Sequence, residues 1–305
     1  MNAKKWLLSL LFFTLSLIIL IEIKYQTSPG NRHEVDYLVN EYIPMLSNEK
    51  YEIIILGDSL AHNAFSNLLL KKNILDLSSN QAISMAGNYF ILKRYLSNNE
   101  VPKEIYLFCV PGLLHNDLNQ KWTYSYFESV FTDNNEIKEI KRLKPNLYNN
   151  NFDIDKYLER RKKSINLGGY KPKKRLLPVE IDEKDLKKDL NYMNQKIKTN
   201  IIKTDKEKDL MESIPTTYLN KIIKLCQENN IDFTLVIEPM PKEYNAIFKT
   251  SKWNKYLTEK KIIYININDY YIFNTYFFRG DGRHIRGKAN QYYQNLIDKH
   301  IIDIY

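Results

Sequence analysis

Two short polar segments near opposite ends of the 305-residue sequence contain the residue types of a serine nucleophile and its base. Gly57-Asp58-Ser59-Leu60 directly follows an apolar run, and Asp281 and His284 precede the last helical pattern. A serine hydroxyl attacks a carbonyl efficiently only when a base takes its proton, and histidine is a common base. A carboxylate three residues before the histidine can accept its Nδ1–H and stabilise the imidazolium. The pattern therefore predicts an acyl-transfer site in which Ser59 is the nucleophile, His284 the general base and Asp281 the acid that orients the histidine.

Alternating strands and helices are expected to position these side chains. Short apolar runs predict buried strands, and apolar residues at helical spacing predict helices. This alternation predicts right-handed crossovers and an α/β fold with a doubly wound parallel sheet. The strands are expected at 51–56, 74–77, 104–110, 232–237 and 262–267, and the helices at 62–71, 84–96, 215–229 and 287–300.

The loops that carry Ser59 and His284 both follow expected strands. The functional crevice of a doubly wound sheet opens at the carboxyl ends of its strands, where the strand order reverses. The Ser59 N–H would lie at the start of a helix, where a developing oxyanion is stabilised. Asp58 is expected to organise this turn by hydrogen bonding. The Gly-x-Ser-x-Gly elbow of α/β-hydrolases is absent, which disfavours that fold.

The regular alternation stops between about 113 and 214, which is interpreted as an insertion into the domain 51–305. The segment is rich in Lys, Asn and Tyr, and it has basic clusters at 160–163 and 171–175. Helices are expected around 183–200. The insertion is either a solvated basic face, or a lid or groove whose charges and tyrosines recognise an anionic glycan.

The N-terminus predicts a transmembrane helix within an anchor at 1–24, followed by a linker at 25–50. Trp6–Ile23 is an 18-residue run whose only charge is Glu22. As a helix it would span about 27 Å, close to the ~30 Å hydrocarbon core of a bilayer. No small-residue cleavage site follows, so an uncleaved signal anchor is favoured. Lys4 and Lys5 predict a cytoplasmic N-terminus, with the rest of the chain on the extracytoplasmic side of the cell membrane.

Composition bounds the remaining function classes. The net charge of +9 is a weak signal, because Lys, Asn, Ile and Tyr are all abundant together, and nucleic-acid binding is unlikely. Two cysteines exclude a disulfide scaffold, and Cys109 and Cys226 are expected to be buried free thiols. No Cys/His cluster suggests zinc, no metal site is expected around Ser59, and no cofactor is implied.

The two end blocks together resemble the SGNH (GDSL) hydrolase superfamily over about 51–111 and 215–300. The sequence has Gly57–Leu60 as the nucleophile block and Asp281 with His284 as the closing block. The resemblance implies a flavodoxin-like SGNH fold and an oxyanion hole that includes the Ser59 N–H. The family's glycine after the second strand is missing, and Gln81 is the candidate donor there. Its asparagine after the third strand corresponds to Asn116, with extra residues before it.

A membrane anchor with this pair of blocks resembles the envelope branch of the superfamily, which includes DltD-like proteins and alginate-acetylation enzymes. The resemblance implies an acyl-enzyme that acts on acyl esters of a cell-envelope polysaccharide. Water would resolve the intermediate in an esterase, and a sugar hydroxyl would do so in an O-acetyltransferase. A membrane-bound partner could deliver the acyl group. The alternative is a non-catalytic envelope assembly or binding protein that retains the fold.

Overall fold

The computed structural model describes the N-terminal helix, most of the α/β domain and the C-terminal segment. The described residues are 3–27, 35, 38–47, 49–65, 70–118, 123, 126–127, 130–131, 133–145, 213–279 and 283–304. The helices expected around 183–200 lie outside this set.

A five-stranded parallel sheet forms the centre of the domain, in the order β2-β1-β3-β4-β5. The strands are β1 (Ile53–Gly57), β2 (Ile74–Asp76), β3 (Glu104–Cys109), β4 (Asp232–Ile237) and β5 (Tyr264–Asn266). This order is that of a flavodoxin-like doubly wound sheet, whose switch point lies between β1 and β3. The predicted α/β class and parallel sheet are confirmed.

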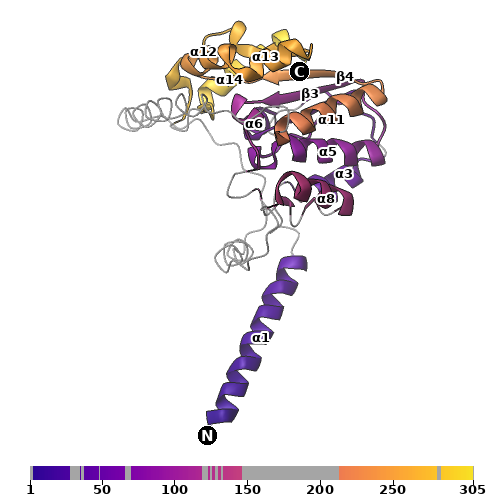
Figure 1. Cartoon of the computed structure of the whole chain (residues 1–305), viewed down its shortest axis with the longest axis vertical. Coiled ribbons are helices and arrows are strands. Elements are labelled where there is room, and N and C mark those ends of the chain that lie inside the picture. Colours follow the sequence, from indigo (N-terminus) through magenta and orange to yellow (C-terminus); the bar gives the residue numbers. More distant parts are fainter. Residues whose placement is uncertain are drawn as a thin grey trace.

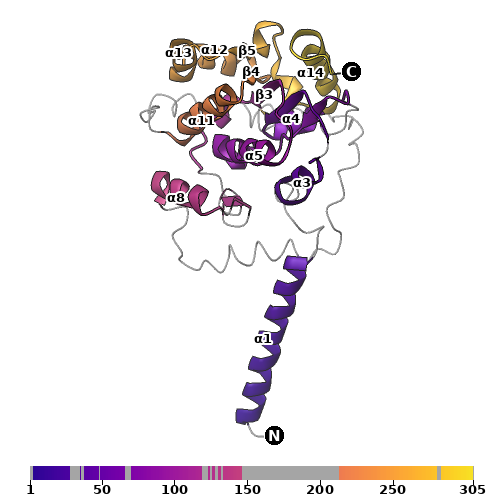
Figure 2. The same ribbon diagram turned by 90° about the vertical axis from the view of Figure 1, so that its right-hand side faces the viewer.

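Side chains alternate between the two faces of the sheet and build two apolar cores. In β1, Ile54 and Leu56 point into one core, whereas Ile53 and Ile55 contact the other. The first core is covered by α5 (Ser84–Asn98), α11 (Ile214–Glu228) and α13 (Lys252–Glu259). The second is covered by α4 (Ser59–Phe65) and α14 (Gly287–His300). Figure 2 shows these two groups of helices on opposite sides of the sheet.

The helices agree with the sequence prediction in most places and differ in two. Helix α4 begins at Ser59 rather than at 62, and two helices that the sequence pattern did not predict, α12 (Lys242–Thr250) and α13, connect β4 to β5. The linker contains η2 (Leu38–Tyr42) and α3 (Ile43–Met45), which pack on the first core. The remaining short helical segments are η3 (Gln81–Ile83), α6 (Pro111–Leu114), η6 (Ile267–Asp269) and η7 (Thr275–Phe277).

The first part of the expected insertion packs into the main core. Phe131 lies 5.4 Å from Phe90 of α5, measured between ring centroids. Helix α8 (Asn134–Leu143) begins after Asp133, whose carboxylate accepts the Asn135 N–H at 2.9 Å. Its buried Glu136 accepts a hydrogen bond from Arg94 of α5 at 3.2 Å. This stretch is therefore continuous with the layer formed by α5.

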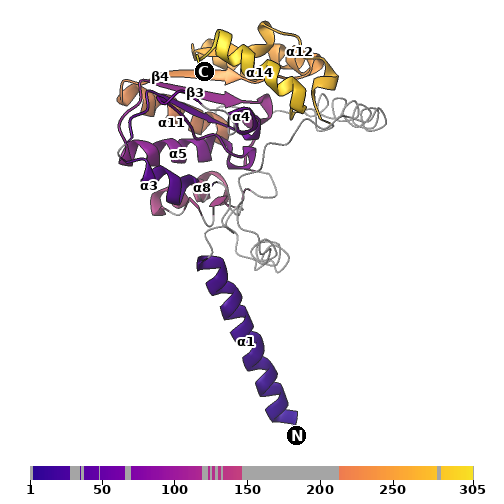
Figure 3. The same ribbon diagram turned by 180° about the vertical axis from the view of Figure 1, so that it is seen from behind.

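The N-terminal helix α1 (Ala3–Thr27) extends away from the α/β body in every view (Figure 1, Figure 2 and Figure 3). Its apolar side chains are exposed: Leu11 is 60% exposed and Phe12 is 75% exposed. No helix in the described part of the chain combines the length and apolarity needed to cross a membrane. The two cysteines are buried free thiols, as predicted.

Candidate active site

Ser59 and His284 meet at the carboxyl end of β1. Ser59 is the first residue of α4, immediately beyond the strand, and it is half-buried. Its Oγ lies 2.9 Å from Nε2 of His284, which is within hydrogen-bond distance. This contact joins two segments that are far apart in the sequence. A hydroxyl bonded to an imidazole nitrogen is the arrangement that lets the imidazole take the hydroxyl proton.

The turn that presents Ser59 is shaped by Asp58, which is 1% exposed. Asp58 Oδ1 accepts the Leu60 N–H at 2.8 Å, and Oδ2 accepts the Val110 N–H at 3.3 Å. The first bond caps the start of α4, which explains why the helix begins at Ser59. The second ties the β1–α4 turn to the end of β3. Asp58 thus organises the turn, as the sequence analysis expected.

Gly57 allows the last residue of β1 to lie close to β3. A Cβ at this position would be 2.8 Å from the Phe108 carbonyl oxygen and 2.8 Å from the Ala61 Cβ. Neither atom belongs to a flexible side-chain end, so the backbone would have to shift. The position therefore requires glycine for close packing beside the Ser59 turn.

Gly57→Ala is expected to lower the free energy of unfolding by about 1–3 kcal/mol through overpacking. Urea denaturation followed by circular dichroism measures this change. Lys72→Ala, at an exposed position, is the matched control and should lie within about 0.5 kcal/mol of wild type. A Gly57→Ala protein as stable as the control would show that the strands separate here at little cost.

An antiparallel bridge holds the backbone next to His284 in place. Phe278 and Ile285 form an isolated antiparallel bridge and are both buried in the second core. The Arg279 N–H donates to the His284 carbonyl oxygen at 2.8 Å. These contacts fix the backbone of His284 at the start of the segment that leads into α14. Asp281, the expected orienting acid, lies outside the described residues.

The two expected oxyanion donors, Gln81 and Asn116, lie next to each other. Asn116 is 5% exposed, and its Nδ2 donates to the Gln81 carbonyl oxygen at 2.6 Å. The Ser84 hydroxyl donates to the Asn116 carbonyl oxygen at 2.6 Å and holds its backbone. Gln81 begins η3, and its N–H donates no hydrogen bond within the part of the chain that the structure describes. A free N–H at this position could serve a substrate oxyanion.

Arg283, which the sequence analysis did not select, connects the Gln81 loop to the His284 turn. Its Nη1 donates to Gln81 Oε1 at 2.9 Å. Gly112, after β3, packs against both side chains, because a Cβ there would be 3.0 Å from Gln81 Nε2 and 3.2 Å from Arg283 Nη2. The loops after β2 and β3 and the His284 turn therefore come together around one site.

His115 was a competing base in the sequence and takes a different position. Its ring packs edge-on against Trp253, with the centroids 6.2 Å apart. Burial lowers the pKa of its imidazole. The histidine that contacts Ser59 Oγ is His284.

Asn116→Ala is expected to lower kcat for ester hydrolysis by about 10²–10³-fold, as for loss of one oxyanion donor. KM should change little, because the bond strengthens as negative charge develops on the carbonyl oxygen. Steady-state kinetics measures both constants. Asn98→Ala on the exposed end of α5 is the control, since Asn98 Nδ2 donates to the Arg94 carbonyl oxygen of its own helix. Equal kcat values for the two variants would remove Asn116 from the reaction.

This chain resembles known proteins only distantly. No family model and no curated protein matches it. One similar solved structure is described as a "putative acylhydrolase" from Bacteroides fragilis, with 10% identity and a TM-score of 0.39 over 89% of this chain and 98% of that one. Another is described as a "putative platelet activating factor" from Streptococcus pneumonia, with 11% identity and a TM-score of 0.39 over 94% and 98%. Likenesses of this size carry no argument about the chain's activity.

Proposed function

We propose that this protein is an enzyme that uses a serine nucleophile to hydrolyse acyl esters or to transfer their acyl group. The observation that carries the proposal is the 2.9 Å contact between Ser59 Oγ and His284 Nε2 at the switch point of the sheet. Doubly wound folds place their reactive groups at this crevice, and the pair is the minimal set for nucleophilic catalysis. The sequence blocks around both residues resemble those of SGNH hydrolases, which supports the same chemistry.

In this proposal Ser59 Oγ attacks the ester carbonyl while His284 Nε2 takes the hydroxyl proton. The negative charge on the carbonyl oxygen is held by the Ser59 and Gln81 N–H groups and the Asn116 amide. His284 then protonates the leaving alcohol, which leaves the acyl group on Ser59. Asp281, three residues before His284, is proposed to orient the imidazole.

The test is turnover of p-nitrophenyl acetate by the full chain, with release of p-nitrophenol and acetate followed separately. A burst of p-nitrophenol before steady acetate release would support an acyl-enzyme. Added sugar alcohols distinguish the two outcomes of the intermediate: an esterase releases only acetate, whereas a transferase forms acetylated sugar. Absence of turnover would favour the alternative, a non-catalytic binding or assembly protein with this fold.

We further propose that the acyl esters belong to a cell-envelope polysaccharide and that α1 anchors the protein on the extracytoplasmic side of a membrane. The apolar side chains exposed along α1, among them Leu11 and Phe12, support an apolar environment for this helix. A membrane-bound partner that delivers the acyl group fits this location. Alkaline carbonate extraction of cell membranes tests the anchor: the full chain should stay with the pellet, and release into the supernatant would contradict it.

A further inference from the structure

Two buried acidic side chains and a buried tyrosine lie behind the Ser59 turn. Asp58 is 1% exposed, and Glu238 and Tyr293 are both 0% exposed. They come from three different elements: the β1–α4 turn, the end of β4 and helix α14. Buried carboxyl groups without a cation are costly unless they are neutral or hydrogen-bonded, so this cluster needs an explanation.

The hydrogen bonds of the cluster leave one position for a proton. Asp58 accepts two backbone N–H groups, and Glu238 Oε1 accepts the Tyr293 hydroxyl at 3.0 Å. Glu238 Oε2 is buried and has no hydrogen-bond partner among the described residues. Both acids flank the end of β3, because the Glu238 N–H donates to the Cys109 carbonyl oxygen at 3.0 Å and Asp58 accepts the N–H of the next residue, Val110. Two neighbouring buried carboxylates have no donor between them and repel each other, so this arrangement requires that one carboxyl carries a proton.

The surroundings assign the proton to Glu238. Asp58 accepts two backbone N–H groups, which favour its ionised form. Glu238 accepts only one phenolic O–H among the described residues, and its Oε2 has no partner there, so its neutral form is favoured. Within the described residues, no group of three or more His, Cys, Asp or Glu side chains could hold a metal ion here.

We propose that Glu238 is a positioning residue of the active site, which keeps its proton at neutral pH and donates it to the Asp58 carboxylate. This rests on the proposed function, in which Ser59 and His284 react. Through the shared proton, the β1–α4 turn that carries Ser59 is linked to β4. Through Tyr293, it is linked to α14, which follows the His284 turn. The buried cluster therefore fixes the distance between the Ser59 and His284 side chains, and it does so from below the active site.

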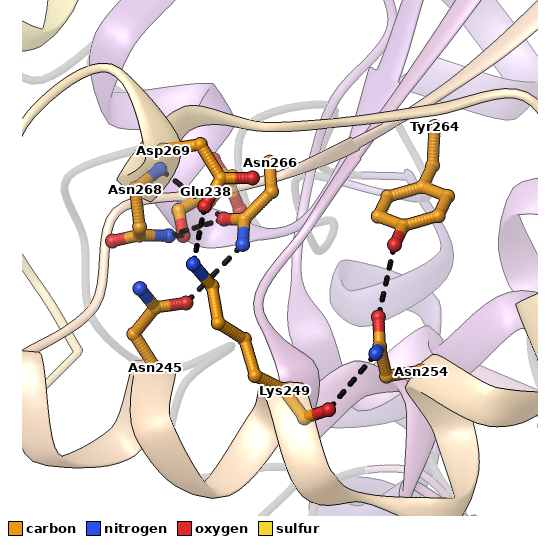
Figure 4. Close-up of polar contacts among 8 residues, drawn as sticks. All are labelled: Glu238, Asn245, Lys249, Asn254, Tyr264, Asn266, Asn268 and Asp269. Atoms are coloured by element: carbon orange, nitrogen blue, oxygen red, sulfur yellow. Dashed lines mark hydrogen bonds and ion pairs between the residues drawn. The ribbon is translucent and has the colours of Figure 1, made fainter. Parts of the chain in front are cut away.

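The backbone of Glu238 is itself held in place by amide side chains at the ends of β4 and β5 (Figure 4). Asn268 Nδ2 donates to the Glu238 carbonyl oxygen at 3.0 Å, and Asn268 Oδ1 accepts the Met240 N–H at 2.9 Å. Asn266 Oδ1 accepts from Asn268 Nδ2 at 2.8 Å and so fixes that amide. The backbone from which the Glu238 side chain extends is thus fixed.

The direction of the pKa shifts agrees with this assignment. Burial raises the pKa of Glu238 well above its usual value of 4.5, and the neighbouring Asp58 charge raises it further. Burial also raises the pKa of Asp58, but its two backbone N–H bonds oppose the rise. In the unfolded chain Glu238 loses its proton near pH 4.5, so above that pH the folded protein binds more protons. The contribution of Glu238 to the free energy of unfolding therefore falls as pH rises above 4.5, until Glu238 ionises in the folded state.

Glu238→Gln and Glu238→Leu test the inference in the full chain. The glutamine amide can donate to Asp58 and accept from Tyr293, so kcat should stay within about threefold of wild type. Leucine can do neither, and kcat should fall about 10²-fold with KM little changed, as for a displaced reactive pair. Glu243→Gln, an exposed acid on α12, is the matched control and should match wild type.

Two further readouts report on the proton itself. The infrared spectrum of wild type at pH 7 should contain the C=O band of a protonated carboxyl that is lost in Glu238→Gln but kept in Glu243→Gln. The decline of unfolding free energy above pH 5 should be shallower in Glu238→Gln than in wild type, by up to one proton. Equal loss of kcat in the glutamine and leucine variants, or the absence of that band, would overturn the inference. Because the band and the slope need no substrate, absence of turnover in every variant counts only against the proposed function.

Discussion

Replacing Ser59 by alanine is expected to lower kcat for p-nitrophenyl acetate by about 10⁴–10⁶-fold. The reason is that Ser59 Oγ is the atom that His284 Nε2 contacts, and no other hydroxyl occupies that position among the described contacts of His284. The loss should be in kcat, because alanine leaves the crevice and its other groups in place. Initial rates at saturating substrate, after subtraction of the uncatalysed reaction, measure it.

The matched control for this variant is Ser97→Ala. Ser97 lies on α5, where its exposed hydroxyl donates to the Lys93 carbonyl oxygen of the same helix, so its loss should leave the site intact. Activity should equal wild type within about twofold, as for a surface substitution. If Ser59→Ala retained the rate of Ser97→Ala, hydrolysis would be due to another group, and the assignment of the nucleophile would be wrong.

His284→Gln is expected to lower kcat by about 10⁴-fold, because the hydroxyl of Ser59 loses its proton acceptor. The residual rate should rise steadily with pH, since hydroxide then replaces the base. Measurement of kcat across the pH range checks both statements. The same variant should also react much more slowly with a fluorophosphonate, because attack on phosphorus needs the same activated hydroxyl.

His300→Gln is the control for the histidine variant. His300 is the last residue of α14, and its ring stacks on Tyr270 with the ring centroids 4.8 Å apart. It has no part in the proposed reaction. It should keep the wild-type pH profile. A His284→Gln protein with an unchanged profile would show that His284 only packs against Ser59.

The sheet and the meeting of Ser59 with His284 could be predicted because their signals are local. Runs such as 232–237 are apolar and flanked by polar turn residues, so β4 is found at its predicted bounds. Ser59 and His284 each follow or approach the carboxyl end of a strand, and parallel strands bring all such ends to one edge. Residue order alone therefore placed them on the same side of the sheet.

Helices α12 and α13 could not be predicted with the same ease because they are short and mixed in polarity. They follow one another directly, separated by Ser251, whose hydroxyl accepts the Asn254 N–H at 3.2 Å and begins α13. A single side of each contributes to the core: Phe248 of α12, and Trp253, Tyr256 and Leu257 of α13. With 9 and 8 residues, both helices are shorter than the window of about 11–18 residues over which a helical period is recognised in a sequence.

The role of Glu238 has no local signal at all. It follows an apolar strand and precedes Pro239, a pattern typical of an exposed loop acid. Its burial depends on Asp58 and Tyr293, which come from distant parts of the chain. The adjacency of Gln81 and Asn116 likewise arises from loops after different strands, and only the fold brings them together.

The most direct test of the central claim is covalent labelling of the full chain with a serine-directed fluorophosphonate, followed by peptide mass spectrometry. The proposed function predicts one modified site, Ser59, with labelling lost in Ser59→Ala and retained in Ser97→Ala. Labelling of a different residue, or equal labelling of wild type and Ser59→Ala, would contradict it.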